Sequence, residues 1–252
     1  MPATLTFDAL SFNPEAVVET IRNHGAVLIR RALSPDAPTR ARSSLDAFHS
    51  ALAERAKSEP SEAERAKFIL VNGLSGPNLP DDLRRLVAEL AGSPVMECVA
   101  AYLGKADTVV PVNHFLFRRR SVQASQALRD AGYLHGFHQD HDHIPGAFPL
   151  NIWMPLSKVD ASCVGLSFVF PYTEQIFPQP FDVDDYLLQN QGTIWTPDVE
   201  PGDVLMFHRS TIHGTYADTS KPVTRYSAEL RCGLLKDVPP AYVNDVIPFA
   251  RA

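Results

Sequence analysis

Cysteine is scarce in this chain, and its arrangement excludes several classes of protein. The sequence contains Cys98, Cys163 and Cys232, which are far apart and odd in number, and no C-x-x-C pair occurs. This usage excludes a small secreted domain stapled by disulfides, and it is typical of buried thiols in a reducing compartment.

The sequence also lacks a long apolar run and an N-terminal leader. No segment stays apolar over the roughly 20 residues that a membrane-spanning helix needs, and no basic region followed by an apolar core opens the chain. We therefore expect a soluble, cytoplasmic protein with no membrane partner.

An excess of positive charge is missing as well. The formal net charge is −6, which argues against a nucleic-acid-binding surface and leaves a small molecule as the expected partner. The chain has 252 residues and 45% hydrophobic composition, enough for a sizeable core without disulfides. Its 21 prolines against 13 glycines favour a fold with many turns and strand edges.

Helical patterns dominate the first hundred residues. Asn13 and Pro14 form an N-cap followed by proline at the first helical position, and Gly25 can end that helix. Further elements are expected as helices over residues 34–57, 81–90 and 93–103, a short apolar strand at 26–29, and a charged, solvated helix or linker at 59–67.

After Gly104 the pattern becomes that of strands. Strands are expected over residues 108–117, 151–156, 165–170, 203–207, 211–216 and 223–230, with a loop or lid at 121–134 and a long connection at 177–196. The sequence therefore predicts one mainly β (α+β) domain over 1–252. Residues 1–104 would form a mostly helical support, and residues 105–235 a β core that carries the site.

The tripeptide His138-Gln139-Asp140 combines two metal-binding side chains. Residues two apart on an extended segment project to the same side, so His138 and Asp140 can hold one metal ion. With His213 as the third ligand, they would form the two-histidine, one-carboxylate face of non-heme Fe(II) oxygenases. Alone the tripeptide is a weak signal, and a surface histidine beside a loop carboxylate is the alternative.

A polar face is predicted downstream. If residues 211–227 form a hairpin whose turn is centred near Thr219, His213 lies opposite Arg225, and Thr215 and Ser227 share their face. An inward arginine in an apolar strand is costly unless it binds a carboxylate, which its planar fork fits at two points. A surface salt bridge is the alternative for Arg225.

In its second half the sequence resembles the phytanoyl-CoA dioxygenase-like Fe(II)/2-oxoglutarate oxygenases. The resemblance covers residues 104–232, in the family's order and at close to its spacings. The matching stretches are Phe137-His-Gln-Asp140, Asn151-Ile-Trp-Met-Pro-Leu156, Gly165-Leu-Ser-Phe-Val-Phe-Pro171, Pro201-Gly-Asp-Val-Leu-Met-Phe-His208, Ile212-His-Gly-Thr215 and Arg225-Tyr-Ser227.

The resemblance implies a double-stranded β-helix of the jelly-roll or cupin-like type, with the N-terminal helices packed on it. It implies Fe(II) at His138, Asp140 and His213, and it implies that Arg225 and Thr215 bind the distal carboxylate of the cosubstrate 2-oxoglutarate.

Two further positions match the family's cosubstrate pocket. Trp153 matches a residue that lines the pocket, with simple core packing as the alternative. Ser227 completes an Arg-x-Ser pattern of related oxygenases.

The sequence departs from the family where substrate contacts are expected. Pro171-Tyr-Thr-Glu174 replaces a common Gly-Ser-His, and His141-Asp142-His143 stands where aromatic or apolar residues are usual. The candidate substrate contacts are Asn113, Arg119, His135 and His141. The alternatives are packing for the asparagine, a solvated strand end for the arginine, and a polar rim or a zinc site for the histidines.

The implied reaction consumes 2-oxoglutarate and O2, releases succinate and CO2, and oxidises an unactivated C–H bond of a small metabolite or natural-product intermediate. Asp140 favours hydroxylation, because halogenating relatives have a small residue there that lets chloride reach the iron. Desaturation, cyclisation or epimerisation are alternatives within the family. A cupin-like metal protein that does not use 2-oxoglutarate and a catalytically silent scaffold are alternatives outside this chemistry.

Overall fold

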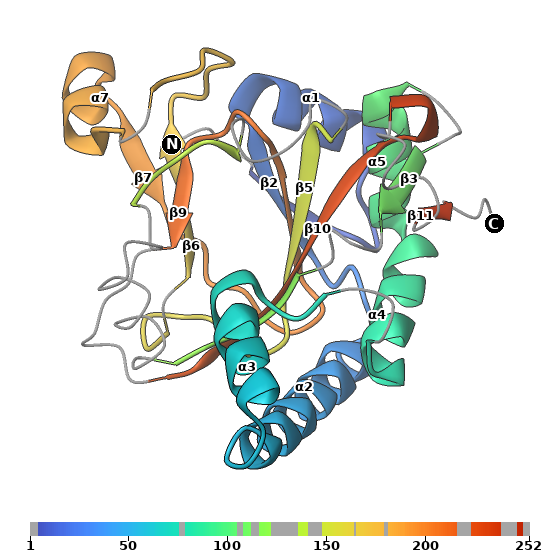
Figure 1. Ribbon diagram of the computed structural model, residues 1–252. Coiled ribbons are helices and arrows are strands. Elements are labelled where there is room, and N and C mark those ends of the chain that lie inside the picture. Colours follow the sequence, from blue (N-terminus) through green and yellow to red (C-terminus); the bar gives the residue numbers. More distant parts are fainter. Residues whose placement is uncertain are drawn as a thin grey trace.

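Two β-sheets of unequal size face each other in the computed structural model of the chain, and helices cover the outer face of the larger sheet (Figure 1). The structure describes residues 5–75, 79–104, 108–111, 116–121, 136–140, 148–163, 165–178, 181–215, 223–237 and 246–248.

The larger sheet has eight strands in the described part of the chain, and β10 is its longest. Listed by position, its strands are β1 (Thr6–Asp8), β2 (Ala26–Arg30), β8 (Val204–His208), β5 (Leu150–Pro155), β10 (Arg225–Leu234), β3 (Thr108–Pro111) and β11 (Val246–Pro248), with β4 (Leu116–Arg120) also paired to β10. Neighbours are antiparallel except β1 and β2.

The smaller sheet contains three antiparallel strands. Its order is β7 (Thr193–Trp195), β6 (Leu166–Phe170) and β9 (His213–Thr215). The helices of the described residues are α1 (Pro14–His24), α2 (Asp36–Arg55), α3 (Pro60–Asn72), α4 (Asp81–Ala91), α5 (Pro94–Leu103), α7 (Val183–Asn190) and the 3-10 helix η3 (Leu235–Asp237).

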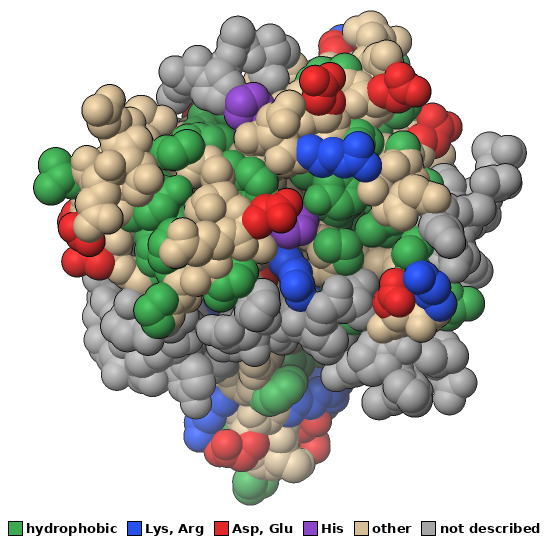
Figure 2. Space-filling model, turned by 90° about the horizontal axis from the view of Figure 1, so that it is seen from above, with side chains coloured by type: hydrophobic (Ala, Val, Ile, Leu, Met, Phe, Trp, Pro, Cys, Tyr) green, Lys and Arg blue, Asp and Glu red, His purple; other side chains and the backbone are tan. Residues whose placement is uncertain are grey.

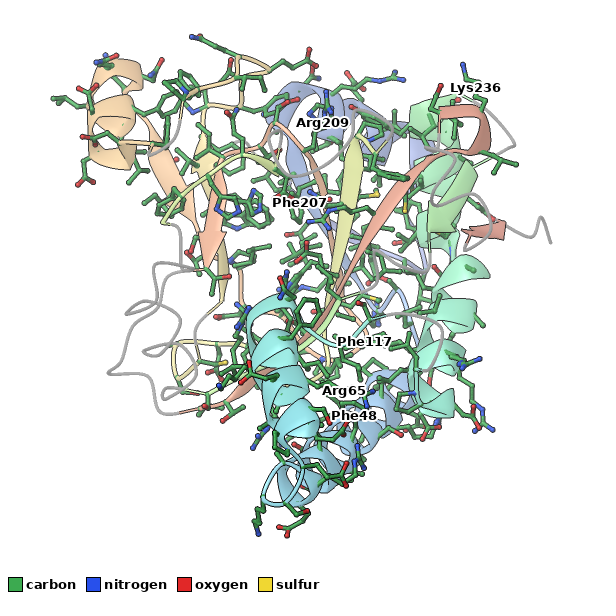
Figure 3. The ribbon with its side chains drawn as sticks, viewed as in Figure 1. Phe48, Arg65, Phe117, Phe207, Arg209 and Lys236 are labelled. Atoms are coloured by element: carbon green, nitrogen blue, oxygen red, sulfur yellow. The ribbon has the colours of Figure 1, made fainter. Side chains whose placement is uncertain are left out.

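Strand alternation produces two apolar layers, one on each side of the large sheet. Along β5, Ile152 and Met154 pack in the layer beneath the helices, whereas Trp153 belongs to the layer between the sheets. Figure 3 labels one aromatic side chain of each layer: Phe117 on the helix side and Phe207 between the two sheets. The layer between the sheets therefore contains apolar side chains from both of them.

Several of the expected elements are present in the described residues. Helix α1 begins after Asn13, whose side chain accepts a hydrogen bond from the Glu15 backbone over 2.9 Å. The helix ends at Gly25, whose φ of 76° is the left-handed conformation that glycine adopts without strain. The expected strands of the second half form β5, β6, β8, β9 and β10.

The charged stretch after Glu59 is a helix, α3, which is one of the two alternatives predicted for it. Two details differ from the prediction. The segment 108–117 contains two strands, β3 and β4. The supposed connection 177–196 contains α7 and β7. The start of α7 could have been found from the sequence, because Asp182 is an N-cap that accepts from the Asp185 backbone over 3.0 Å.

In the described residues, no single helix is long and apolar enough to cross a membrane. Helices α4 and α5 meet the length and composition criteria only together, as a pair bent by 61°.

The two-layer packing makes a direct prediction for stability. Leu45 in α2 has 0% exposure, whereas Leu188 in α7 is 81% exposed. Leu45→Ala is expected to lower the free energy of unfolding by about 2–5 kcal/mol, because it removes buried methyl groups and leaves a cavity. Leu188→Ala, the same substitution in an exposed helical position, should change it by no more than about 0.5 kcal/mol. Urea denaturation measures both, and equal losses would contradict the assignment of the core.

Candidate metal and cosubstrate site

The structure brings His138, Asp140 and His213 together from distant parts of the chain. Their ligand atoms all lie within 4.8 Å of one another. His138 and His213 are joined by two reciprocal backbone hydrogen bonds of 2.9 Å, and the backbone N–H of Asp140 donates to the carbonyl of Arg209 over 2.9 Å. The extended segment before Asp140 is therefore fixed to β9 by its backbone, and this contact positions the three ligands.

Both imidazoles present Nε2 to the centre of this cluster. His138 Nδ1 lies 3.1 Å from the carbonyl oxygen of Gly136, and His213 Nδ1 lies 2.8 Å from that of Thr211. A carbonyl oxygen can only accept, so each Nδ1 carries the hydrogen and each Nε2 keeps a lone pair. The Nε2 atoms lie 3.6 Å and 3.8 Å from the oxygens of Asp140. This is the orientation that a metal-binding histidine needs.

Burial and neighbouring charges shift the pKa values of the three side chains in different directions. Burial lowers the pKa of His213. Burial also acts to lower the pKa of His138, but its contact with Asp140 outweighs burial, and the pKa is raised. For Asp140, burial alone would raise the pKa, yet His213, His138 and Arg231 hold it below its usual value. Asp140 is therefore an anion at neutral pH despite being 5% exposed.

Asp140 is oriented by a residue that the sequence reasoning did not single out. Asn151 on β5 is fully buried, and its Nδ2 donates to Asp140 Oδ2 over 2.6 Å. Arg231 Nη2 lies 4.0 Å from the same oxygen. The sequence could have indicated this role, because Asn151 lies two residues before Trp153 and so shares its face of an otherwise apolar strand.

Arg225 lies buried on the same wall, with 3% exposure. Its Nη1 donates to the hydroxyl of Thr215 over 3.2 Å, and its guanidinium carbon lies 5.8 Å from the centre of the Trp153 ring. Ser227, two residues further along β10, shares its face. Burial lowers the pKa of Arg225 to about 10, so the group is still a cation at neutral pH.

The predicted hairpin, in which His213 lies opposite Arg225, is wrong. Strand β9, with His213, pairs with β6 in the small sheet, whereas β10, with Arg225, pairs with β3, β4 and β5 in the large sheet. The Arg225–Thr215 hydrogen bond therefore crosses from one sheet to the other. Packing of the two sheets, rather than strand pairing, unites the metal cluster with the arginine.

A second group of buried charges lies between the two. Glu229 on β10 makes ion pairs with Arg118 of β4 and, over 3.1 Å, with Arg231. Burial would raise the pKa of Glu229, but the two guanidinium groups outweigh it and keep the pKa low. Seen from above, basic, acidic and histidine side chains meet near the middle of the face among hydrophobic ones (Figure 2).

The donor set fits a divalent metal ion of the iron type. Two imidazole nitrogens and one carboxylate oxygen converge, and the second nitrogen of each ring and the second oxygen of the carboxylate have their own partners. The aromatic ring of Phe207, whose centroid lies 4.7 Å from that of His213, forms an apolar wall beside the ligands.

Residues 21–225 match the family model of phytanoyl-CoA dioxygenase (PhyH). The chain belongs to the phytanoyl-CoA dioxygenase family. The predicted enzyme class, a non-heme Fe(II)/2-oxoglutarate-dependent oxygenase, and its cofactors are thereby confirmed at the level of the family. No protein of curated function matches the sequence.

Solved structures confirm the fold. AviO1 from Streptomyces viridochromogenes Tue57 is 14% identical, with 91% of this chain and 98% of that chain covered and a TM-score of 0.58. SnoK, a carbocyclase from nogalamycin biosynthesis, is 16% identical, with 97% and 94% covered and a TM-score of 0.59. The non-heme monooxygenase ThoJ is 15% identical, with 92% and 79% covered and a TM-score of 0.59.

The predicted substrate contacts of this family member are only partly placed. Asn113, His135 and His141 lie outside the described residues. Arg119 is on the outer face of β4, where its Nε donates to Tyr226 Oη over 3.1 Å and lies 3.3 Å from Asp46. The structure therefore does not bring Arg119 to the metal cluster, because its neighbours in the strand, not Arg119 itself, point inward.

The cluster predicts the effect of losing one ligand. His138→Ala should weaken the binding of Mn(II), a redox-stable substitute for Fe(II), by at least about 100-fold, as measured by calorimetry. Loss of a direct ligand is expected to lower metal affinity more than loss of a residue that only supports a ligand. His24→Ala, at the end of α1, should leave it unchanged. Unaltered binding in the His138 variant would remove this residue from the site.

Asn151 is expected to act through Asp140. Asn151→Leu keeps the volume but removes the donor to Oδ2, so metal affinity should fall about 10–100-fold with the fold intact by circular dichroism. Asn151→Asp should also fail to restore affinity, because it places a second anion against Asp140. Full affinity in the leucine variant would show that the hydrogen bond does not support the metal ligand.

Proposed function

We propose that this chain hydroxylates an unactivated C–H bond of a small metabolite or natural-product intermediate at the His138, Asp140 and His213 centre. The observation that carries the proposal is the buried Arg225, which lies across from the metal cluster and shares a hydrogen bond with Thr215. A buried guanidinium needs an anionic partner, and its planar fork fits the distal carboxylate of 2-oxoglutarate.

Each residue has a defined task. When bound, Fe(II) with 2-oxoglutarate and dioxygen supplies an oxidant and releases succinate and CO2. His138, Asp140 and His213 would hold the metal with two imidazole nitrogens and one carboxylate oxygen. Arg225 fixes the far end of the cosubstrate, assisted by Thr215, and so orients its keto acid end toward the metal.

Trp153 and Ser227 line the side of the cosubstrate site that excludes water. Trp153 is 2% exposed and lies beneath the Arg225 guanidinium, and Ser227 offers a hydroxyl on the same face. An apolar environment strengthens the attraction between Arg225 and a carboxylate, because few competing waters reach it. We assign Trp153 and Ser227 to the lining of the cosubstrate pocket on this basis.

Asp140 supports hydroxylation as the outcome. Its carboxylate would hold the metal at the position where halogenating relatives have a small residue that lets chloride bind. Other outcomes of the same oxidant are the alternatives, because solved neighbours include the SnoK carbocyclase and the SnoN epimerase of nogalamycin biosynthesis and the ThoJ monooxygenase. These neighbours also support a natural-product intermediate as substrate. A cupin-like metal protein without 2-oxoglutarate is the weaker candidate, since it brings no carboxylate that would fit the planar fork of Arg225.

We propose that residues 1–252 act as one domain in the cytoplasm. Helices α1 to α5 share their apolar layer with the sheet that carries Arg225. The three cysteines are buried, as is usual for thiols in a reducing compartment. A small molecule is the proposed partner, with no nucleic acid and no membrane.

Arg225 provides the test. In wild-type protein, Fe(II)-dependent succinate formation from 2-oxoglutarate under air is expected even before a prime substrate is added. Arg225→Ala should weaken 2-oxoglutarate binding by at least about 30-fold, because truncating a buried charge pair costs about 2–5 kcal/mol. Arg85→Ala, at an exposed position in α4, is the matched control. Iron binding without any iron-dependent succinate would favour the cupin-like alternative.

A further inference from the structure

The three consecutive arginines of β4 are separated by strand alternation. Arg119 faces the helices, where it contacts Tyr226 and Asp46. Arg118 and Arg120 lie on the opposite face, level with Ser227 and Arg225 in the pairing of β4 with β10. Arg118 and Arg120 are therefore neighbours of Arg225, which together with Thr215 is called the cosubstrate clamp below.

Arg118 keeps part of its hydrogen-bonding capacity. Its Nη1 pairs with Glu229 Oε2, while the other oxygen of Glu229 accepts from Arg231 over 3.1 Å. One carboxylate is thus divided between two guanidinium groups. Arg118 Nε is buried and has no hydrogen-bond partner in the described part of the chain. Such a buried donor is rare in folded proteins and indicates a ligand or water partner.

Arg120 adds a further cation at this place. It lies directly opposite Arg225 in the strand pairing, and its Nη1 donates to the neutral carbonyl of Leu70 over 2.6 Å. Burial, together with the positive charges of Arg118 and Arg225, lowers the pKa of Arg120 to about 9.

Among the described residues, this wall carries more guanidinium groups than carboxylates. The guanidinium groups belong to Arg118, Arg120, Arg225 and Arg231, and the carboxylates to Glu229 and Asp140. A divalent metal and dianionic 2-oxoglutarate would cancel each other, so their binding adds no net negative charge to this set. One guanidinium, Arg225, is enough for the distal carboxylate.

We propose that Arg118 and Arg120 form an oxyanion subsite beside the cosubstrate clamp, which binds a carboxylate or phosphate group of the prime substrate. The subsite rests on the proposed function and adds the chemical class of the substrate to it. Arg118 is connected through Glu229 and Arg231 to Asp140, so an acidic group bound here lies on the reaction side of the wall. A charged anchor at this point would orient the substrate toward the metal.

The test measures binding with simple probes rather than turnover. Protein loaded with Mn(II) and saturating 2-oxoglutarate is titrated with benzoate, phenyl phosphate and neutral benzamide, and the unfolding temperature and calorimetric heat are recorded. We expect one or both anions, but not benzamide, to bind wild-type protein. Benzoate against phenyl phosphate distinguishes the two anion types.

Arg119→Gln is the matched control, because it changes the adjacent arginine on the opposite face. In Arg119→Gln the Kd of the probe should be unchanged. In Arg118→Gln and in Arg120→Gln it should rise at least tenfold, and Arg118→Lys and Arg120→Lys should recover part of the affinity. Retained 2-oxoglutarate binding confirms that these variants are folded.

Three results would overturn the subsite: no anion binds wild-type protein, benzamide binds equally well, or the three glutamine variants behave alike. Displacement of the probe by 2-oxoglutarate would also overturn it, by assigning the arginines to the cosubstrate. Failure of 2-oxoglutarate to bind wild-type protein would instead contradict the proposed function, and the probes are then titrated with Mn(II) alone.

Discussion

Strand β10 has to satisfy opposite requirements on its two faces. Tyr226, Ala228 and Leu230 pack against the helices in an apolar layer. Arg225, Ser227 and Glu229 alternate with them and turn toward the small sheet. Burying charge is costly unless it is paired and hydrogen-bonded, so the inner face requires partners from other strands. The arrangement of the site follows from how those partners are supplied.

These partners come from β4, from β10 itself and from the smaller sheet. Strand β4 supplies Arg118 to Glu229, and Arg231 of β10 pairs with the same carboxylate. Strand β9 of the smaller sheet supplies the hydroxyl of Thr215 to Arg225. Arg231 also approaches Asp140, which accepts a hydrogen bond from Asn151 of β5. The candidate metal ligands and the Arg225–Thr215 pair therefore belong to one connected set of buried polar groups. Such a set holds geometry well when complete, and loss of one member leaves another without its partner.

The helices contribute to the site indirectly. They cover the outer face of the large sheet and so allow the polar residues of β10 and β5 to point only inward. Figure 1 shows this asymmetry, with helices on one side of the large sheet and the small sheet on the other. The carbonyl of Leu70 in α3 also accepts a hydrogen bond from Arg120, which ties this helix to β4.

The sequence by itself determined the residue types and their local order. His138 and Asp140 share a side because of the two-residue period of extended chain, and capping at Asn13 and Gly25 is a local effect. The family resemblance, which rests on motifs and spacing, also named Arg225 and Thr215, whose contact is present.

Only the tertiary structure decided which residues meet. His213 and Arg225 lie on different sheets, so a pairing rule applied to adjacent segments placed them wrongly. Asn151, Glu229 and Arg231 gain their roles from contacts between strands far apart in the chain, and no local pattern contains that information. Likewise, which members of an arginine triplet face inward depends on which side of β4 the helices cover, and that choice is made by packing.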